Sequence, residues 1–167
     1  MMRSEPIVFA LAFALSVPLG LAPLGARAQD LPIAATADIP ETVKECFADY
    51  DPRAEGPSCL GQAAQGCTAA ATDSTRDIIA CIDAETAAWD GLLNAEYKAR
   101  RAEMTAPGLA ERLQTAQRAW IAYRDAECGL EVARWGDATL SGVVGANCRM
   151  EMTATRASEL RDKKADP

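Results

Sequence analysis

Six cysteines constrain the fold of this 167-residue chain more than any other feature. They are Cys46, Cys59, Cys67, Cys81, Cys128 and Cys148. An even number of cysteines in a secreted chain is typical of a disulfide framework. None is spaced C-x-x-C, which disfavours a thioredoxin-like redox site and a zinc ribbon, because both need two sulfurs on one tight turn. We therefore predict three structural disulfides.

The first 28 residues have the three-part pattern of a signal peptide. Arg3 precedes an uncharged apolar run from Ile7 to Leu24, and Ala26-Arg27-Ala28 offers a cleavage site. Prolines and a glycine interrupt the run, which argues against a membrane anchor. Cleavage would leave Gln29 first, and since this residue is not a cysteine we expect no lipoprotein. The prediction is a periplasmic or secreted protein.

Residues 73 to 104 carry the pattern of a long amphipathic helix. Its apolar face recurs at steps of three and four, at Ile78, Ile82, Glu85, Trp89, Leu92 and Glu96, widened by Cys81, Ala88 and Leu93. Thr72, Asp73 and Ser74 offer N-caps. Pro107 and Gly108 supply the stop, because proline cannot continue the hydrogen-bond ladder.

Two more helices are expected, the first from Leu109 to Trp135 with Gly136 as its cap. Its predicted inner face comprises Leu109, Leu113, Ala116, Trp120, Tyr123, Glu127 and Leu130. After a loop of small residues, 137 to 146, a third amphipathic stretch carries Cys148, Met152, Thr155 and Leu160 toward a charged tail, Arg161 to Lys164. We predict a small all-α, disulfide-bonded, up-down-up helical bundle over residues 73 to 167.

Residues 29 to 72 differ from the rest, with four prolines and three of the cysteines. Short helices are expected at about 40 to 49 and 58 to 65, and each has an apolar face that needs a partner. We interpret this segment as a disulfide-tied N-terminal arm that lies along the bundle.

The charge of the chain is acidic, with 24 acidic and 17 basic residues and a net charge of −7. Loss of residues 1 to 28 would leave 23 and 15, a net charge of about −8. This balance disfavours binding to nucleic acid or anionic lipid and at long range favours a cationic partner.

The residue types present argue against catalysis. The chain has no histidine, which excludes serine-histidine and cysteine-histidine catalytic arrangements and histidine metal sites. Two carboxylate pairs, Glu85 with Asp90 and Asp125 with Glu127, are the remaining acid-base candidates. Neighbouring acidic residues on helices are most often surface charge or network partners. We predict that the protein is not an enzyme and needs no metal or cofactor.

Three strings of the sequence carry a family resemblance. The first runs from Cys81 to Tyr97 and includes Trp89, Asp90 and Asn94, and the second is Ala116-Gln-Arg-Ala-Trp-Ile-Ala-Tyr-Arg-Asp-Ala-Glu-Cys128. The third contains Cys148, Thr155-Arg156 and Leu160. Their order and spacing over residues 67 to 161 resemble the LprI-type lysozyme inhibitor family, with the run of thirteen as the most specific part.

The resemblance implies a small helical extracytoplasmic domain, inhibition of lysozyme, and the disulfides Cys67 to Cys81 and Cys128 to Cys148. Cys46 and Cys59 are then left to pair with each other, one of fifteen possible connectivities for six cysteines. The Cys128 to Cys148 pair also suits antiparallel helices, because these residues flank one loop.

The matched motif residues are interpreted mainly as scaffold, with direct partner contact as the alternative. Trp120 and Tyr123 are expected to fill the seam between helices while Arg124 lies along it. On the first helix, Asp90, Asn94 and Tyr97 share a face and are predicted to hydrogen-bond across to an arginine of another helix. The full set is Trp89, Asp90, Asn94, Tyr97, Arg118, Trp120, Tyr123, Arg124, Asp125 and Arg156.

The functional prediction is a secreted binding protein that blocks a cationic lysozyme by occupying its active-site cleft. The alternative is a structural or envelope-stress module that binds another periplasmic protein. The segment from Asp137 to Asn147 is the candidate contact loop, because it joins two long helices and is rich in small residues that approach a cleft closely. Its candidate contact residues are Asp137, Ser141, Gly142 and Asn147, although its glycines also suit simple turns.

Overall fold

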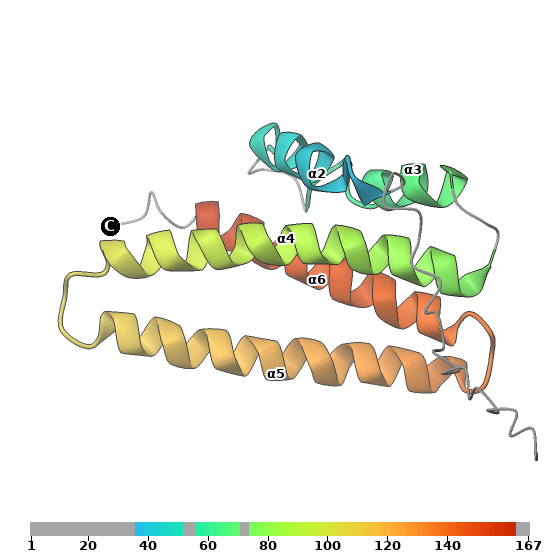
Figure 1. Cartoon of the computed structure of the whole chain (residues 1–167). Helices are drawn as coiled ribbons and strands as arrows, with labels where there is room; N and C mark the ends of the chain where they lie inside the picture. The colour runs from blue at the N-terminus through green and yellow to red at the C-terminus, as the bar shows by residue number, and fades with distance from the viewer. Residues whose placement is uncertain (1–35, 52–55, 71–73, 163–167) are drawn as a thin grey trace, which may run out of the picture.

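A computed structural model describes residues 36–51, 56–70 and 74–162 (Figure 1). The described residues form the helices α2 (Ile39–Ala48), α3 (Gln62–Ala70), α4 (Thr75–Glu103), α5 (Leu109–Trp135) and α6 (Ser141–Asp162). They contain no strand, which confirms the all-α prediction. The predicted leader, residues 1 to 28, lies outside the described residues. None of the described helices is both long and apolar enough to cross a membrane.

The three long helices run up, down and up, as predicted (Figure 1). α6 lies at the centre of the packing, with α4 along much of one side and α5 on another. α4 and α5 have few contacts with each other. The bundle is therefore open between α4 and α5, and this opening holds the candidate site.

Local sequence signals set the ends of these helices. Ser74 caps α4, since its Oγ accepts a hydrogen bond from the backbone N–H of Asp77 at 3.1 Å. Gly108 is the N-cap of α5 and Gly136 is its C-cap. Their φ angles are 79° and 55°, values that residues with a side chain rarely adopt. α3 begins at Gln62 rather than 58, because a turn from Pro57 to Gln62 occupies the expected first residues.

The buried face of α6 differs from the prediction. Met152 and Thr155 are only half-buried, whereas the buried positions are Gly145, Ala146, Met150, Thr153, Ala154, Ala157, Ser158 and Leu160. Small residues dominate this set because α6 packs on both α4 and α5, and only small side chains let both helices come close to its backbone. A Cβ on Gly145 would lie 2.5 Å from Val132 Cγ2, and one on Gly142 would lie 2.9 Å from Ile79 Cδ1. These two glycines serve helix packing.

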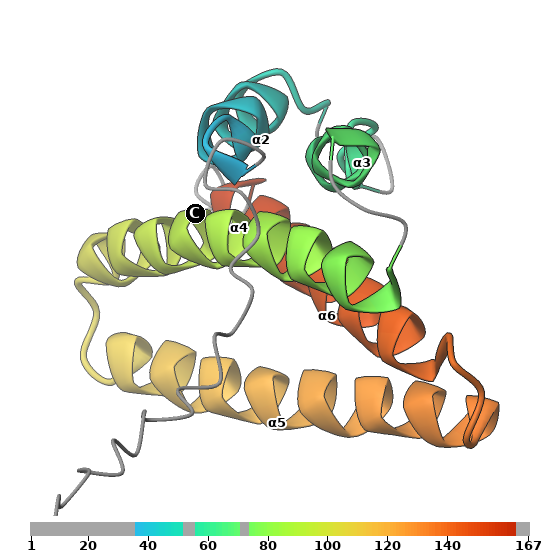
Figure 2. The ribbon, with the colours of Figure 1, turned by 45° about the vertical axis from the view of Figure 1, so that its right-hand side comes forward.

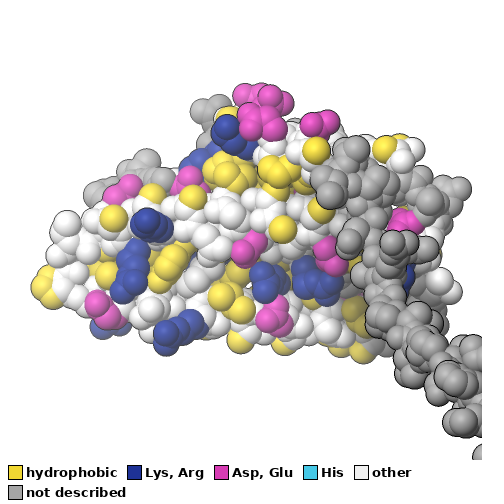
Figure 3. Space-filling model, in the orientation of Figure 1, with side chains coloured by type: hydrophobic (Ala, Val, Ile, Leu, Met, Phe, Trp, Pro, Cys, Tyr) yellow, Lys and Arg dark blue, Asp and Glu magenta, His cyan; other side chains and the backbone are white. Residues whose placement is uncertain are grey.

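α5 is much less buried than predicted. Gln117 and Cys128 are its only buried residues, and Leu109, Tyr123 and Leu130 of the predicted inner face are 42%, 57% and 55% exposed. The physical reason is that α5 packs on one helix, α6, so that a narrow strip of its surface is covered. Figure 3 shows hydrophobic side chains along the lower edge of the molecule, where α5 lies.

The short helices α2 and α3 pack across α4, on the side away from α5 (Figure 2). Their buried residues, among them Val43, Phe47 and Ala64, join one core cluster with residues of α4 and α6. Arg161, predicted as part of a charged tail, stacks on Phe47 and Tyr50 and donates hydrogen bonds to both of their carbonyl oxygens. This arginine thus ties the end of α6 to the end of α2.

The structure contains the three predicted disulfides. Cys46 pairs with Cys59, Cys67 with Cys81, and Cys128 with Cys148. The first links α2 to the turn before α3, the second links α3 to α4, and the third links α5 to α6. Each bond joins two segments that also pack against each other. The disulfides and the packing therefore stabilise the same arrangement of helices.

We expect Cys128→Ala with Cys148→Ala to lower the free energy of unfolding by about 3 kcal/mol in the chain-entropy model. The bond closes a loop with a sequence separation of 20, so its loss raises the conformational entropy of the unfolded chain. Apart from Cys128, α5 has one buried residue, Gln117, and therefore little packing to offset the loss. Urea unfolding followed by circular dichroism measures the change. A loss below about 1 kcal/mol would show that α5 is held by its contacts with α6 alone.

Candidate functional site

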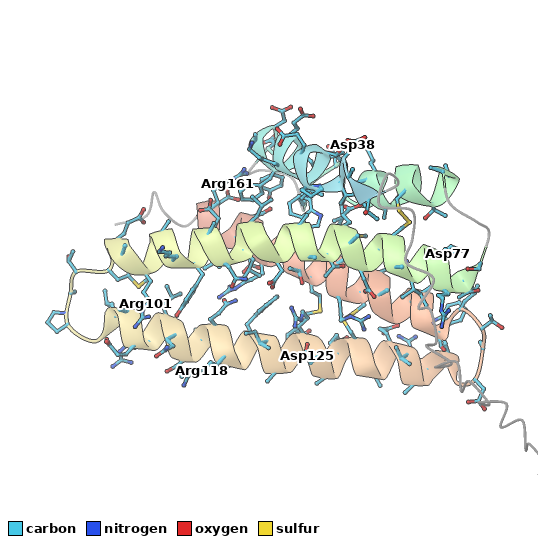
Figure 4. The ribbon with its side chains drawn as sticks, viewed as in Figure 1. Asp38, Asp77, Arg101, Arg118, Asp125 and Arg161 are labelled. Atoms are coloured by element: carbon cyan, nitrogen blue, oxygen red, sulfur yellow. A yellow bond between two sulfur atoms is a disulfide. The ribbon has the colours of Figure 1, made fainter. Side chains whose placement is uncertain are left out.

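Six of the motif residues line one crevice between α4 and α5. α4 contributes Asp90, Asn94 and Tyr97, and α5 contributes Arg118, Trp120 and Arg124. The crevice has a volume of about 260 Å³, and its remaining lining residues are Leu93, Gln114, Gln117 and Ile121. Figure 4 shows α4 and α5 standing apart with side chains of both helices between them. The sequence motif therefore marks a real surface feature.

The predicted hydrogen bonds across this crevice are absent. Asn94 Nδ2 donates to Asp90 Oδ2 at 2.8 Å, within α4. Arg124 donates to Asp125 Oδ1 and, at 3.3 Å, to Thr153 Oγ1 on α6. Within the described residues, no hydrogen bond joins Asp90, Asn94 or Tyr97 to an arginine of α5 or α6, although elsewhere Asp83 of α4 pairs with Arg149 of α6 at 3.6 Å. The physical reason is that α4 lies apart from α5. Asp90 and Asn94 of α4 therefore bond to each other, and Arg124 of α5 bonds to Asp125 and to α6.

Trp120 is half-buried on α5 and has two guanidinium groups near its ring. The Cζ atoms of Arg124 and Arg156 lie 5.3 and 5.8 Å from its ring centroid, distances suited to cation–π attraction. Tyr123 does not join it in the seam, since this side chain is 57% exposed and lies along the groove between α5 and α6. The predicted aromatic pair is therefore wrong, whereas Arg124 lies beside Trp120 as predicted.

Gln117 is a crevice residue that the sequence reasoning missed. Its side chain is 6% exposed, and its Oε1 accepts a hydrogen bond of 3.1 Å from Arg156 Nε. Its Nε2 is buried and has no hydrogen-bond partner in the described part of the chain. Glutamine on a helix is ordinarily a surface residue. The only feature of the sequence that could have indicated its role is its position inside the thirteen-residue motif.

Trp89 is the one motif residue that is wholly core. It is 0% exposed, and its ring meets that of Phe47 edge-on at a centroid distance of 6.0 Å. Its Nε1 donates to Glu85 Oε1 at 3.1 Å. The scaffold interpretation thus holds for Trp89, which fixes α2 on α4.

Both carboxylate oxygens of Glu85, one of the acid-base candidates, accept hydrogen bonds that hold the fold together. Its Oε1 also accepts from the backbone N–H of Gly61 at 2.8 Å, and its Oε2 accepts from the backbone N–H of Ala64 at 2.7 Å. A buried carboxylate at the N-terminus of α3 satisfies backbone donors that the helix itself leaves free. The other candidate pair is also divided, because Asp125 binds Arg124 while Glu127 lines a different groove.

The candidate contact loop is much shorter than predicted. α6 begins at Ser141, so Gly142 and Asn147 are helical, and the connection from α5 consists of residues 136 to 140. Asp137 is exposed in this turn, whereas Ser141 and Gly142 are half-buried. Gly142 packs toward Ile79, so it serves the packing of α6 on α4. Small residues in this segment suit close helix packing, so the predicted loop is wrong from residue 141 onward.

The other face of α5 carries a groove with α6 of about 460 Å³. Three glutamates line it, Glu127, Glu131 and Glu151, together with Tyr123, Val144, Asn147, Cys148 and Met152. Beyond its end, Trp135 and Leu140 flank the turn and are 48% and 50% exposed. An acidic groove and two exposed large apolar side chains therefore lie along the same pair of helices, α5 and α6.

Metal-ligand clusters are absent from the described residues, where no group of three or more histidine, cysteine or acidic side chains could hold an ion. All six cysteines are in disulfides. The site residues present are suited to hydrogen bonding and apolar contact.

Comparison with known proteins supplies a family. Residues 67–160 match the family described as lysozyme inhibitor LprI, from within α3 to two residues before the end of α6. An uncharacterized protein of Rhizobium meliloti (strain 1021) is 32% identical over 101 residues, which cover 53% of this chain and 73% of that protein. No solved structure is significantly similar to the chain. The chain belongs to the LprI lysozyme inhibitor family.

Proposed function

We propose that the protein is an extracytoplasmic inhibitor that binds a cationic lysozyme and acts without catalysis. The family match over residues 67–160 is the observation that carries this proposal. The leader pattern of the sequence and three disulfides support a periplasmic or secreted location, because disulfides persist in oxidising compartments.

The proposed contact surface, named the α5–α6 end, consists of Trp135, Leu140 and the turn between them. These large apolar side chains are about half exposed, as binding anchors are before a partner covers them. The Cys128–Cys148 bond holds the two helices just behind the turn, which reduces the conformational entropy lost on binding. A short, rigid projection is a shape suited to entering an active-site cleft.

Charge on the same side of the molecule favours a cationic partner. Glu127, Glu131 and Glu151 line the neighbouring groove, and Arg134 neutralises one of them through a 2.8 Å contact with Glu131. The net charge of the whole chain is −7. Attraction at long range would speed encounter with a cationic enzyme and weaken at high ionic strength.

Trp135→Ala is expected to weaken inhibition of a susceptible lysozyme by at least about tenfold, the usual effect of removing an aromatic anchor. The measurement is the inhibition constant in a cell-wall turnover assay, with the disulfide-bonded protein and a panel of lysozymes. Leu109→Ala is the matched control, because Leu109 is 42% exposed at the opposite end of α5. Equal inhibition by both variants and the parent would remove the α5–α6 end as the contact.

A second outcome bears on the function itself. If the unmodified protein inhibits no lysozyme of the panel, the alternative of a structural module that binds another periplasmic protein takes precedence. Activity of the protein on cell-wall fragments without lysozyme would instead contradict the non-catalytic proposal.

A further inference from the structure

We propose that two copies of this protein pair through the outer face of α5, with their two α5 helices antiparallel. This inference goes beyond the proposed function, because lysozyme inhibition is assigned to the α5–α6 end, which shares no residue with this face. Three observations carry it: a long helix face that no described element covers, a regular line of small residues along its centre, and charges that complement each other when the helix is reversed.

The outer face of α5 lies opposite its contact with α6. Gln117 is buried and bonds to Arg156 of α6. Ala126 follows Gln117 by nine residues, or two and a half helical turns, and therefore lies on the opposite side of α5. Figures 1 and 2 show α4 and α6 on one side of α5 and no described helix on the other. At the edge of this face Tyr123 and Leu130 are 57% and 55% exposed, as large apolar side chains are at interaction surfaces before a partner covers them.

A line of small, exposed residues, named the outer strip, follows the centre of this face. Its members succeed each other at steps of four and three, the spacing of residues that face a second helix in a coiled coil. They are Thr115, Ala119, Ala122, Ala126, Gly129 and Ala133. A Cβ added to Gly129 would meet no neighbouring side chain or helix within 4 Å, so the strip has room for a partner. Small side chains along its whole length would let a second helix come close.

The charges beside the outer strip identify the partner as a second copy and set its direction. Arg118 and Asp125 are exposed on the same edge of the strip, seven residues and almost two turns apart. An antiparallel copy, related by a two-fold axis near Ala122, places Arg118 of each chain close to Asp125 of the other. A parallel copy would instead place arginine beside arginine and aspartate beside aspartate. Complementary charges of this kind select partner and orientation more than they add affinity.

Both members of this charge pair can accept the contact. No item of the described structure joins Arg118 to another side chain, and it is exposed. Asp125 already pairs with Arg124, but both hydrogen bonds from Arg124 end on Oδ1 and leave Oδ2 for a second donor.

The length of the outer strip predicts a weak dimer. The strip spans about 27 Å of helix, and a contact along it buries on the order of 1,000 Å² in total, near the lower limit for specific complexes. We therefore expect a dissociation constant of about 10 to 100 µM.

Sedimentation velocity of the disulfide-bonded protein at about 5 to 500 µM tests the inference, with a concentration-dependent shift from monomer to dimer as the expected result. Ala126→Arg should weaken the dimer at least about tenfold, because it places a long charged side chain in the middle of the strip. Ala87→Arg is the matched control, since it makes the same change at an exposed position of α4 and should leave the dimer intact.

Charge reversal tests the antiparallel direction. Arg118→Glu should weaken the dimer several-fold, because each new glutamate then lies near Asp125 of the other copy. Adding Asp125→Arg to the same chain reverses both partners and should restore most of the affinity, whereas a residue that only stabilised the monomer would not be rescued. Circular dichroism of each variant checks that the helices persist.

Three results would overturn the inference. They are a protein that stays monomeric over the whole concentration range, a dimer equally stable in Ala126→Arg and Ala87→Arg, and a double charge reversal that restores nothing. If the parent is monomeric and Ala126→Arg weakens inhibition of lysozyme, the outer face belongs to the lysozyme contact instead.

Discussion

Trp89→Ala is expected to lower the free energy of unfolding by about 3 to 5 kcal/mol, the range for truncating a large aromatic side chain in a core. The side chain is 0% exposed and contacts the ring of Phe47, which belongs to α2. Its removal would leave a cavity where α2 meets α4 and would also remove the N–H that donates to Glu85. Chemical denaturation with oxidised protein measures the loss.

Trp135→Ala is the matched control for this experiment. Trp135 is 48% exposed at the end of α5, so its truncation should change the free energy of unfolding by less than about 1 kcal/mol. Similar losses for the two tryptophans would contradict the core that the structure places around Trp89.

The sequence was most informative where one pattern determined the packing. The inner face of α4 was predicted almost completely, because this helix packs on α6 along one side and on α2 and α3 along another, and its apolar residues follow that contact. The disulfide pairing was also correct, but for two of the bonds it depended on the family resemblance. Ser74 and Gly136 acted as the expected helix caps, Ser74 through its side chain.

The errors occurred where packing does not follow hydrophobicity. Leu109, Tyr123 and Leu130 remain exposed on α5, because this helix contacts little besides α6. On α6, glycine and alanine mark the tightest packing, and the sequence alone did not separate this use from a flexible loop. Local periodicity describes one helix at a time, whereas these positions depend on how close a second helix approaches.

The candidate site shows the same limit. The motif strings indicated most of the residues that line the crevice, yet their predicted hydrogen bonds assumed that α4 and α5 touch. Gln117 is identified as a site residue only by its burial and by its hydrogen bond with Arg156, which lies 39 residues further along the chain. A long-range partner of this kind leaves no trace in the spacing of the sequence.

Glu85→Ala is expected to lower the free energy of unfolding by about 3 to 5 kcal/mol, because it leaves three N–H donors in a buried site without their acceptor. The substitution would remove the acceptor of three donors, the backbone N–H groups of Gly61 and Ala64 and the Nε1 of Trp89. Each donor left unpaired in a buried site costs about 1 to 3 kcal/mol, and entry of water would recover part of this.

Glu85→Gln separates the charge of this side chain from its shape. Its carbonyl oxygen can keep the bonds to Gly61 and Trp89, while its amide group faces the N–H of Ala64, so we expect a smaller loss of about 2 to 3 kcal/mol. Glu151→Gln, at an exposed position of α6, is the neutralisation control and should have little effect. Amide hydrogen exchange should locate the loss in α3, because Glu85 binds two backbone N–H groups at the start of that helix. Uniform loss of protection across α5 and α3 alike would mean that Glu85 stabilises the fold as a whole rather than the attachment of α3.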